Sequence, residues 1–201
     1  PTVPLLRMPS CVYTSDQTFR GAAEVTHFGP VPLPGVTPQW RLLDREGAVL
    51  REGSLAQQDI PQGGVIPLGE IVIGLKDLSA PAQLKIELSV GKFSNGWDLW
   101  VYPTAVDNTI PEGVHVATRL DESVHALLQE GKRVLLLPEK GTVAPARFGP
   151  VPAGFPPIFW NTFWFPSQEL RTLGLLMDEH HPLFAQFPTE FHSNWQWWDL
   201  A

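Results

Sequence analysis

The chain has 201 residues, enough for one large domain or two small ones, and 43% of them are hydrophobic, so it can bury a sizeable core. Its formal net charge is −7, its pI is about 5.3 and it has no run of lysine or arginine, which excludes the basic surface of a nucleic-acid-binding protein. No apolar run approaches the roughly 20 residues of a membrane helix. Cys11 is the only cysteine, so we expect neither an internal disulfide nor a cysteine-based metal site.

The first half of the chain is patterned as short strands. Phe19, Gly21, Ala23, Val25 and His27 fall on one face of a period-two segment, which predicts a half-buried strand. Proline-rich residues 28–38 and residues 59–67 are expected to be loops. Residues 39–43 and 48–51 flank a glycine-containing turn and predict a hairpin. The segments 68–75, 84–90 and 97–102 are further strand candidates, and Asn95-Gly96 predicts the hairpin turn before the last of them.

About seven short strands over about 95 residues, with no helix between them, are typical of an immunoglobulin-like antiparallel β-sandwich. We therefore expect this sandwich to occupy residues 1–104. The polar, turn-rich residues 104–113 are a plausible domain boundary. The predicted class of the whole chain is α+β in two parts, because the pattern changes after this boundary.

Residues 112–201 predict a small, aromatic-rich α/β domain. A strand at 114–117 precedes a helix at 121–129, which places Val124, Leu127 and Leu128 on one face and has Gly131 as its C-cap. The apolar run 133–137 follows, and such a run is typical of a strand buried on both faces of a parallel sheet. Strand, helix and strand in this order form a βαβ unit. With 173–177 as a third strand, the domain is still incomplete, since an open α/β sheet normally needs more strands.

Aromatic residues are concentrated near the end of the chain. Five of the eight tryptophans lie between positions 158 and 200: Trp160, Trp164, Trp195, Trp197 and Trp198. Such a cluster forms a core, an interface or a sugar-stacking surface. We expect residues 158–165 and 191–200 to fold back onto the rest of the chain, with Trp160 and Trp164 among its most buried residues.

Few residues carry a pattern that predicts chemistry. Glu190 and His192 are two positions apart and could converge as a catalytic acid–base pair, although a structural hydrogen bond fits the same spacing. The run from Asp178 to His181 is interpreted as a surface loop rather than a metal site, because adjacent side chains do not share a face. The sequence has no phosphate-binding, dinucleotide-binding or nucleophile-elbow motif. No motif therefore predicts a catalytic residue, a metal site or a cofactor.

A sugar-binding surface is the alternative use of the aromatic end. Trp195, Trp197 and Trp198 could stack on pyranose faces, with Asn194, Gln196 and Asp199 binding hydroxyl groups. The strand carrying Trp97 and Trp100 is a second possible platform. Solvent exposure of these rings distinguishes a binding platform from a core.

Several stretches resemble one protein family. They are PLLRMP at 4–9, VTHFGP at 25–30, NGWDLWVYP at 95–103 and residues 181–199, of which FPTEFHSNWQWW at 187–198 is the most specific part. They are similar to the C-terminal part of bacterial glycoside hydrolase family 2 (beta-galactosidase-like, sugar-binding) proteins. In that family the two catalytic glutamates lie on a TIM barrel, which this chain has no room for, so no catalytic residue is carried over. The α/β part is also similar to an amidotransferase-like or flavodoxin-like domain without its nucleophile motif.

The resemblance implies a non-catalytic accessory region of a carbohydrate-active enzyme, which packs against or completes a glycosidase site. The implied partners are the remainder of the parent glycosidase chain and a carbohydrate, in a bacterial periplasmic or secreted protein. The chain begins at Pro1 without a methionine and ends directly after the aromatic run, so we expect it to be part of a longer protein. A stand-alone carbohydrate-binding module is the alternative, and an independent hydrolase that uses Glu190 and His192 is a third.

Overall fold

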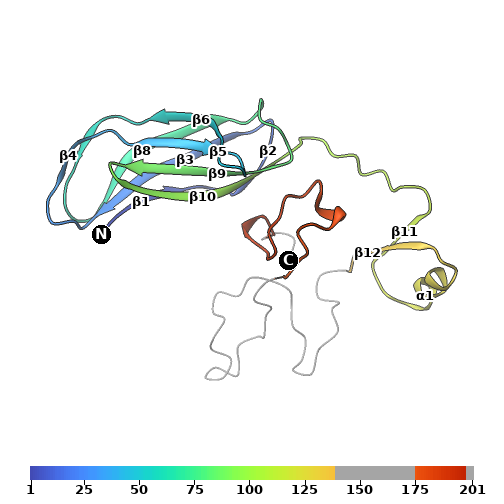
Figure 1. The fold of residues 1–201 in the computed structure, drawn as a ribbon. Helices are drawn as coiled ribbons and strands as arrows, with labels where there is room; N and C mark the ends of the chain where they lie inside the picture. The colour runs from blue at the N-terminus through green and yellow to red at the C-terminus, as the bar shows by residue number, and fades with distance from the viewer. Residues whose placement is uncertain (139–174, 198–201) are drawn as a thin grey trace, which may run out of the picture. The chain divides into compact units, whose positions relative to one another are not determined.

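The computed structural model describes residues 1–138 and 175–197, and in these ranges the protein is rich in β-strands and has a single α-helix (Figure 1). The chain forms two compact units. The first comprises Pro1–Ala105 together with Asp178–Gln196, and the second comprises Val106–Met177 together with Trp197–Ala201. No helix in the described ranges is long and apolar enough to cross a membrane.

Two sheets make up most of the first unit. The three-stranded sheet has the order β1-β3-β8, and the five-stranded sheet has the order β2-β10-β9-β5-β6. Neighbouring strands are antiparallel except β2 and β10, which are parallel. The strands are β1 (Thr2–Arg7), β2 (Val12–Thr14), β3 (Thr18–His27), β5 (Gln39–Leu43), β6 (Val49–Ser54), β8 (Val65–Gly74), β9 (Ala82–Val90) and β10 (Phe93–Tyr102).

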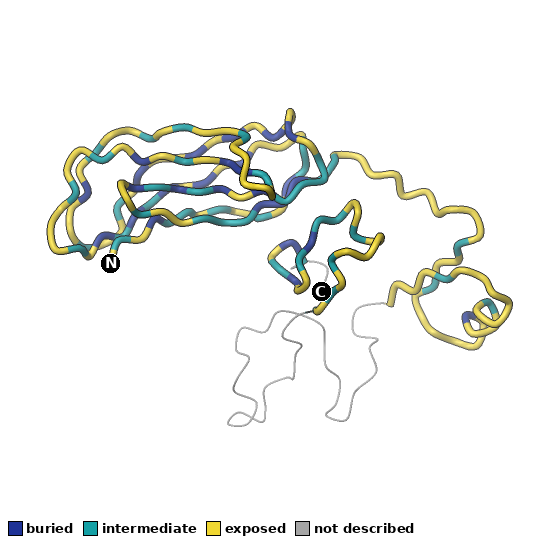
Figure 2. The backbone as a smooth tube through the Cα atoms, in the orientation of Figure 1, coloured by how far each residue is buried: buried dark blue, intermediate teal, exposed yellow. Residues whose placement is uncertain are grey.

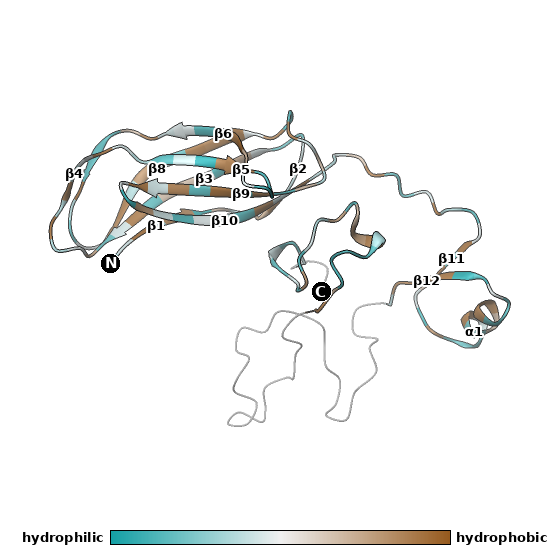
Figure 3. Cartoon of the chain, in the orientation of Figure 1, coloured by the Kyte–Doolittle hydropathy of each residue, from teal (hydrophilic) through white to brown (hydrophobic). Residues whose placement is uncertain are grey.

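One hydrophobic core is shared by the two sheets, because alternate side chains of their strands point to the same interior. In β3, Phe19, Ala23, Val25 and His27 are buried, as their period-two spacing predicts (Figure 2). Apolar and polar residues alternate in the same way along β9 (Figure 3), and the apolar ones, Leu84, Ile86, Leu88 and Val90, join this core. The predicted hairpin of residues 39–51 is confirmed as β5 and β6.

The hairpin turn predicted at Asn95-Gly96 is wrong. The turn lies at Gly91 and Lys92, between Val90 and its strand partner Phe93, and Gly91 has a positive φ of 60°. Asn95 and Gly96 lie inside β10. There the Asn95 side chain donates a hydrogen bond to the carbonyl oxygen of Pro4, so a contact distant in sequence overrides the local turn preference.

Two segments expected to be loops contain short strands. Within 28–38 lies β4 (Leu33–Val36), which pairs with β7 (Gln58–Ile60), and β8 begins at Val65 rather than at 68. Gly35 makes this pairing possible, because its φ of +58° bends the strand and its N–H donates to Asp59. The local proline content concealed these strands.

The predicted strand–helix–strand order of the second unit is confirmed. The strands β11 (Val114–Ala117) and β12 (Arg133–Leu136) are parallel, with α1 (Glu122–Gln129) between them in sequence. The carboxylate of Asp121 caps the helix by accepting from the Val124 N–H, and Gly131 follows the helix end with a φ of 73°.

The expected burial of the last apolar run is not found in the described residues. Leu135 and Leu137 are 44% and 52% exposed, and within the described ranges β12 pairs only with β11. Residues 175–177 form no strand, and positions 173 and 174 lie outside the described residues. Trp160, Trp164 and Trp198 also lie outside them, so the predicted burial of Trp160 and Trp164 stays a prediction.

Candidate functional site

The candidate site lies where residues 178–196, the C-terminal part of the first unit, pack on the five-stranded sheet. We call residues 178–196 the docked segment; it contains the 3-10 helix η1 (Pro182–Phe184) and most of η2 (Trp195–Trp197). In β10, Leu99 and Val101 belong to the core, so Asp98, Trp100 and Tyr102 face the opposite side of the sheet. This outer face is covered, because Trp100 is fully buried although it is not part of the core.

Tyr102 is the principal anchor of the docked segment. Its ring stacks on Phe187 with 5.6 Å between centroids, and its hydroxyl donates to Gln196 Oε1 at 2.6 Å. The Gln196 amide in turn donates to the Pro188 carbonyl oxygen at 2.8 Å, and Gln196 is buried. Burial raises the pKa of the Tyr102 hydroxyl above its usual range, so this donor keeps its proton at any physiological pH. Gln196 is therefore committed to packing rather than to a ligand.

A network of amides and carboxylates lies beside this anchor. Glu190 accepts hydrogen bonds from Gln83 Nε2 at 3.3 Å and from Asn194 Nδ2 at 2.9 Å. Asn194 Nδ2 also lies 3.3 Å from Asp98 Oδ2. The nearest separation of His192 Nε2 from the Glu190 carboxylate is 3.7 Å, too long for a hydrogen bond. The structure thus places the predicted pair Glu190 and His192 side by side, and both oxygens of the carboxylate are bound by side-chain amides.

The predicted sugar-binding residues differ in their exposure to solvent. Trp195 is 59% exposed, Trp197 and Asn194 are half-buried, and Trp198 and Asp199 lie outside the described residues. Phe191, which was not singled out, is 62% exposed and contacts the His192 ring edge-on at 4.6 Å.

The second predicted platform does not exist as an open surface. Trp100 is fully buried, and Trp97 packs against the sandwich core. The indole Nε1 of Trp100 and the Oε1 of Gln83, its partner on β9, are buried without a hydrogen-bond partner among the described residues.

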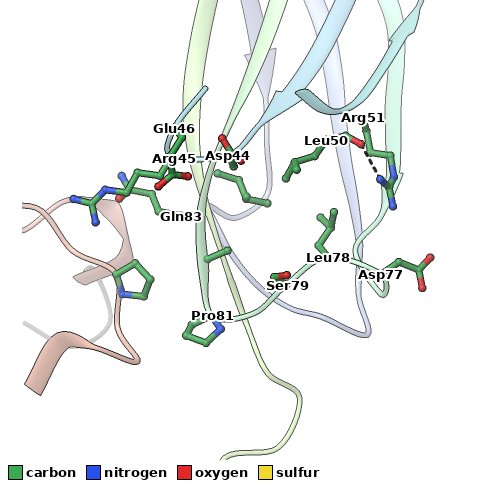
Figure 4. A pocket seen from close by; sticks show the side chains of 13 residues that line it. Asp44, Arg45, Glu46, Leu50, Arg51, Asp77, Leu78, Ser79, Pro81 and Gln83 are labelled. Carbon is green, nitrogen blue, oxygen red and sulfur yellow. Dashed lines mark hydrogen bonds between the residues drawn. The ribbon is translucent and has the colours of Figure 1, made fainter. Parts of the chain in front are cut away.

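A cavity of about 470 Å³ opens beside the network (Figure 4). The turn between β5 and β6, the connection from β8 to β9, and Pro188 of the docked segment line it. Gln83 belongs both to this lining and to the Glu190 network. The lining residues are Asp44, Arg45, Glu46, Leu50, Arg51, Asp77, Leu78, Ser79, Pro81, Ala82, Gln83, Leu84 and Pro188.

The side chains from Asp178 to His181 bind backbone N–H groups and a residue of the sandwich. Glu179 forms an ion pair with Arg45 at 3.1 Å, and Asp178 accepts from the His180 N–H. His181 Nδ1 accepts from the Leu183 N–H and so caps η1. Across residues 1–138 and 175–197, no three His, Cys, Asp or Glu side chains are grouped as metal ligands would be.

Cys11 is a half-buried thiol. Desolvation, with a smaller contribution from the charge of Asp98, raises its pKa, so the thiol stays protonated at neutral pH and is a poor nucleophile.

The sequence interpretation missed Gln83, the anchor role of Tyr102, and the charged residues of the cavity. One signal was available for the anchor. Large aromatic residues occupy both faces of β10, Trp97 on one and Trp100 and Tyr102 on the other, and this pattern indicates a strand covered on both sides. No local pattern marks Gln83 or the cavity, because its walls come from four separate stretches of the chain.

Comparison with known families gives two adjoining matches. Residues 17–103 match a model described as a domain of unknown function (DUF8488), and residues 115–201 match a model described as a domain of unknown function (DUF8487). Among curated proteins, none matches the chain.

Solved structures resemble about half of the chain and only remotely. The alkylpurine DNA glycosylase AlkC of Pseudomonas fluorescens is 10% identical, with a TM-score of 0.42 over 50% of this chain and 30% of its own. The sporulation control protein Spo0M of Bacillus subtilis is 10% identical, with a TM-score of 0.38 over 50% and 49%. A beta-glucuronidase from glycoside hydrolase family 2 is 14% identical, with a TM-score of 0.37 over 49% of this chain and 11% of its own.

Proposed function

We propose that the chain is a non-catalytic accessory region of a carbohydrate-active enzyme, made of an immunoglobulin-like sandwich and an incomplete flavodoxin-like α/β part. The observation that carries the non-catalytic role is the position of the Glu190 carboxylate. It holds the docked segment on the sheet through Gln83 of β9, and its other oxygen is bound by Asn194 within the segment. The carbohydrate context comes from the resemblance of residues 187–198 to glycoside hydrolase family 2 proteins.

The arrangement of the carboxylates is unsuited to glycoside hydrolysis. Such enzymes normally flank the scissile bond with two carboxyl groups that are separated by open space for substrate or water. Here the side chains of Asp98 and Glu190 are both contacted by the same nitrogen, Asn194 Nδ2. The amide therefore occupies the place between them, where a glycosidase needs open space for substrate or water.

The direct test is an assay of the purified chain on a panel of chromogenic glycosides. We expect no turnover above the uncatalysed rate, and a Glu190→Gln variant that differs from the parent only in the stability of the docked segment. Turnover that survives repurification and is lost in Glu190→Gln would overturn the non-catalytic role. His115→Ala, a change at an exposed histidine of β11, is the control for unspecific effects of substitution.

A carbohydrate-binding module is the second candidate function. The exposure of Trp195 and Phe191, four positions apart in the docked segment, favours it, because an exposed aromatic ring can stack on the apolar face of a sugar. A Trp195→Ala variant distinguishes the two roles. Lost retention on immobilised polysaccharide with unchanged thermal stability supports a binding face, and unchanged retention opposes it.

A further inference from the structure

We propose that the cavity beside the docked segment is a binding site for a neutral sugar. This inference takes its ligand class from the proposed carbohydrate role, but it concerns a different surface from Trp195 and Phe191. The cavity volume of about 470 Å³ falls within the range of small-molecule sites, roughly 300–1,000 Å³. All of its described lining residues belong to the first unit.

The lining combines an apolar surface with charged groups at its sides. Leu50 and Leu78 lie between Asp44 on one side and Arg51 on the other (Figure 4), and both also border the sandwich core. A pyranose ring has the complementary character: its C–H face is apolar, and its hydroxyl groups both donate and accept hydrogen bonds. Carboxylates accept hydrogen bonds from sugar hydroxyl groups, a guanidinium donates to them, and a serine hydroxyl can donate to them or accept from them.

Several of the polar side chains that line the cavity can form further hydrogen bonds. Within the described residues, Asp77 and Ser79 have no hydrogen-bond partner, and the Arg51 guanidinium makes only a bond to the Leu50 carbonyl oxygen. Arg45, in contrast, is held by Glu179. The cavity therefore offers acceptors and donors that water satisfies in the free protein and that sugar hydroxyl groups can satisfy in a complex.

The balance of charge selects a neutral ligand over an acidic one. The lining contains three carboxylates, from Asp44, Glu46 and Asp77, and two guanidinium groups, of which Arg45 is already paired with Glu179. A uronate or a phosphate would enter a site with excess negative charge and would lose affinity. We therefore expect methyl galactosides and glucosides to bind, and glucuronate to bind more weakly or not at all.

The experiment is a titration of the full ¹⁵N-labelled chain with methyl β-D-galactopyranoside, methyl β-D-glucopyranoside and D-glucuronate, followed by amide chemical shifts. We expect shifts at Leu50, Arg51 and residues 77–79, with smaller ones at Glu190, because Gln83 joins the cavity to the network. No shift with either neutral glycoside in the millimolar range, or tighter binding of glucuronate, overturns the proposal.

Ser79→Trp tests the location. Ser79 is exposed at the cavity wall, so the indole can fill the cavity without replacing a core residue. We expect it to weaken glycoside binding at least about tenfold, the equivalent of one lost charge-assisted hydrogen bond. Ser94→Trp, at an exposed serine of β10 outside the cavity lining, is the matched control and should bind like the parent.

The outcomes separate this proposal from the proposed function. Binding that persists in Ser79→Trp and disappears in Trp195→Ala overturns the cavity as the site and leaves the carbohydrate role intact. Absence of all sugar binding also overturns the cavity site, while the test of the non-catalytic role, turnover of chromogenic glycosides, is unaffected. Turnover together with binding at the cavity would contradict the proposed function alone.

Discussion

Tyr102 shows how one residue links the sheet to the docked segment, and its titration gives a prediction. The chain has two tyrosines, and burial raises the pKa of both Tyr13 and Tyr102. A folded-state pKa above the unfolded value of about 10 means that the protonated phenol stabilises the fold. This contribution is complete below about pH 10 and is lost as the pH rises toward the folded-state pKa.

We therefore expect tyrosinate absorbance to appear only at a pH well above 10, together with loss of the near-ultraviolet circular dichroism of the folded chain. A parallel titration of Tyr102→Phe assigns the Tyr13 component. Ionisation of both phenols near their ordinary pKa, with the fold intact, would show that Tyr102 is not enclosed by Phe187 and Gln196.

At the scale of elements, the docked segment is held by a few polar contacts that can be removed singly. Gln196→Ala leaves the Tyr102 hydroxyl and the Pro188 carbonyl group without their partner, at a cost of about 1–3 kcal/mol for each group that stays buried. Because the sandwich core lies on the other side of the sheet, we expect local opening rather than global unfolding. Amide hydrogen exchange should accelerate between residues 182 and 196 and change little in β3 or β9.

Gln186→Ala is the matched control for this change. Gln186 lies in the same segment and is exposed, so its exchange profile should equal that of the parent. Equal protection of the segment in both variants would contradict the anchor role of Gln196.

The same elements show what the sequence could and could not predict. The alternation in β3 is local, because each residue's face follows from its neighbours, and the strand is where the pattern places it. The turn at Asn95-Gly96 failed because Asn95 bonds to Pro4, 91 positions away. Gln83 and Glu190 are 107 positions apart, so nothing in the run around either residue could indicate their hydrogen bond. The sequence could indicate candidate site residues such as Glu190 by their chemical type. It could not indicate their hydrogen-bond partners, because these lie far away along the chain.

At the scale of the whole molecule, the two compact units do not coincide with the residue ranges that the two family models match. One family model ends at residue 103 and the other begins at 115, yet residues 178–196, within the second match, complete the first unit. The outer face of the five-stranded sheet consequently depends on residues that lie 94 to 107 positions after their partners in the sheet. A boundary drawn in sequence at 104 would separate this face from the segment that covers it.

A fragment of residues 1–105 keeps all the strands of both sheets but lacks the docked segment, so the ring of Tyr102 loses its stacking partner Phe187, and we expect Trp100 on the same face to become accessible as well. Exposing roughly 100 Å² of apolar surface costs about 2.5 kcal/mol, a substantial share of the 5–15 kcal/mol that stabilises a typical domain. We expect the fragment to have a lower melting temperature than the first unit of the full chain, to bind a hydrophobic dye and to show red-shifted tryptophan fluorescence.

Addition of a synthetic peptide of residues 178–197 should reverse the dye binding, whereas the same peptide with Gln196→Ala should do so less well. A fragment as stable as the full chain, with no dye binding, would show that the sandwich covers Trp100 by itself and that the docked segment contributes little to the unit.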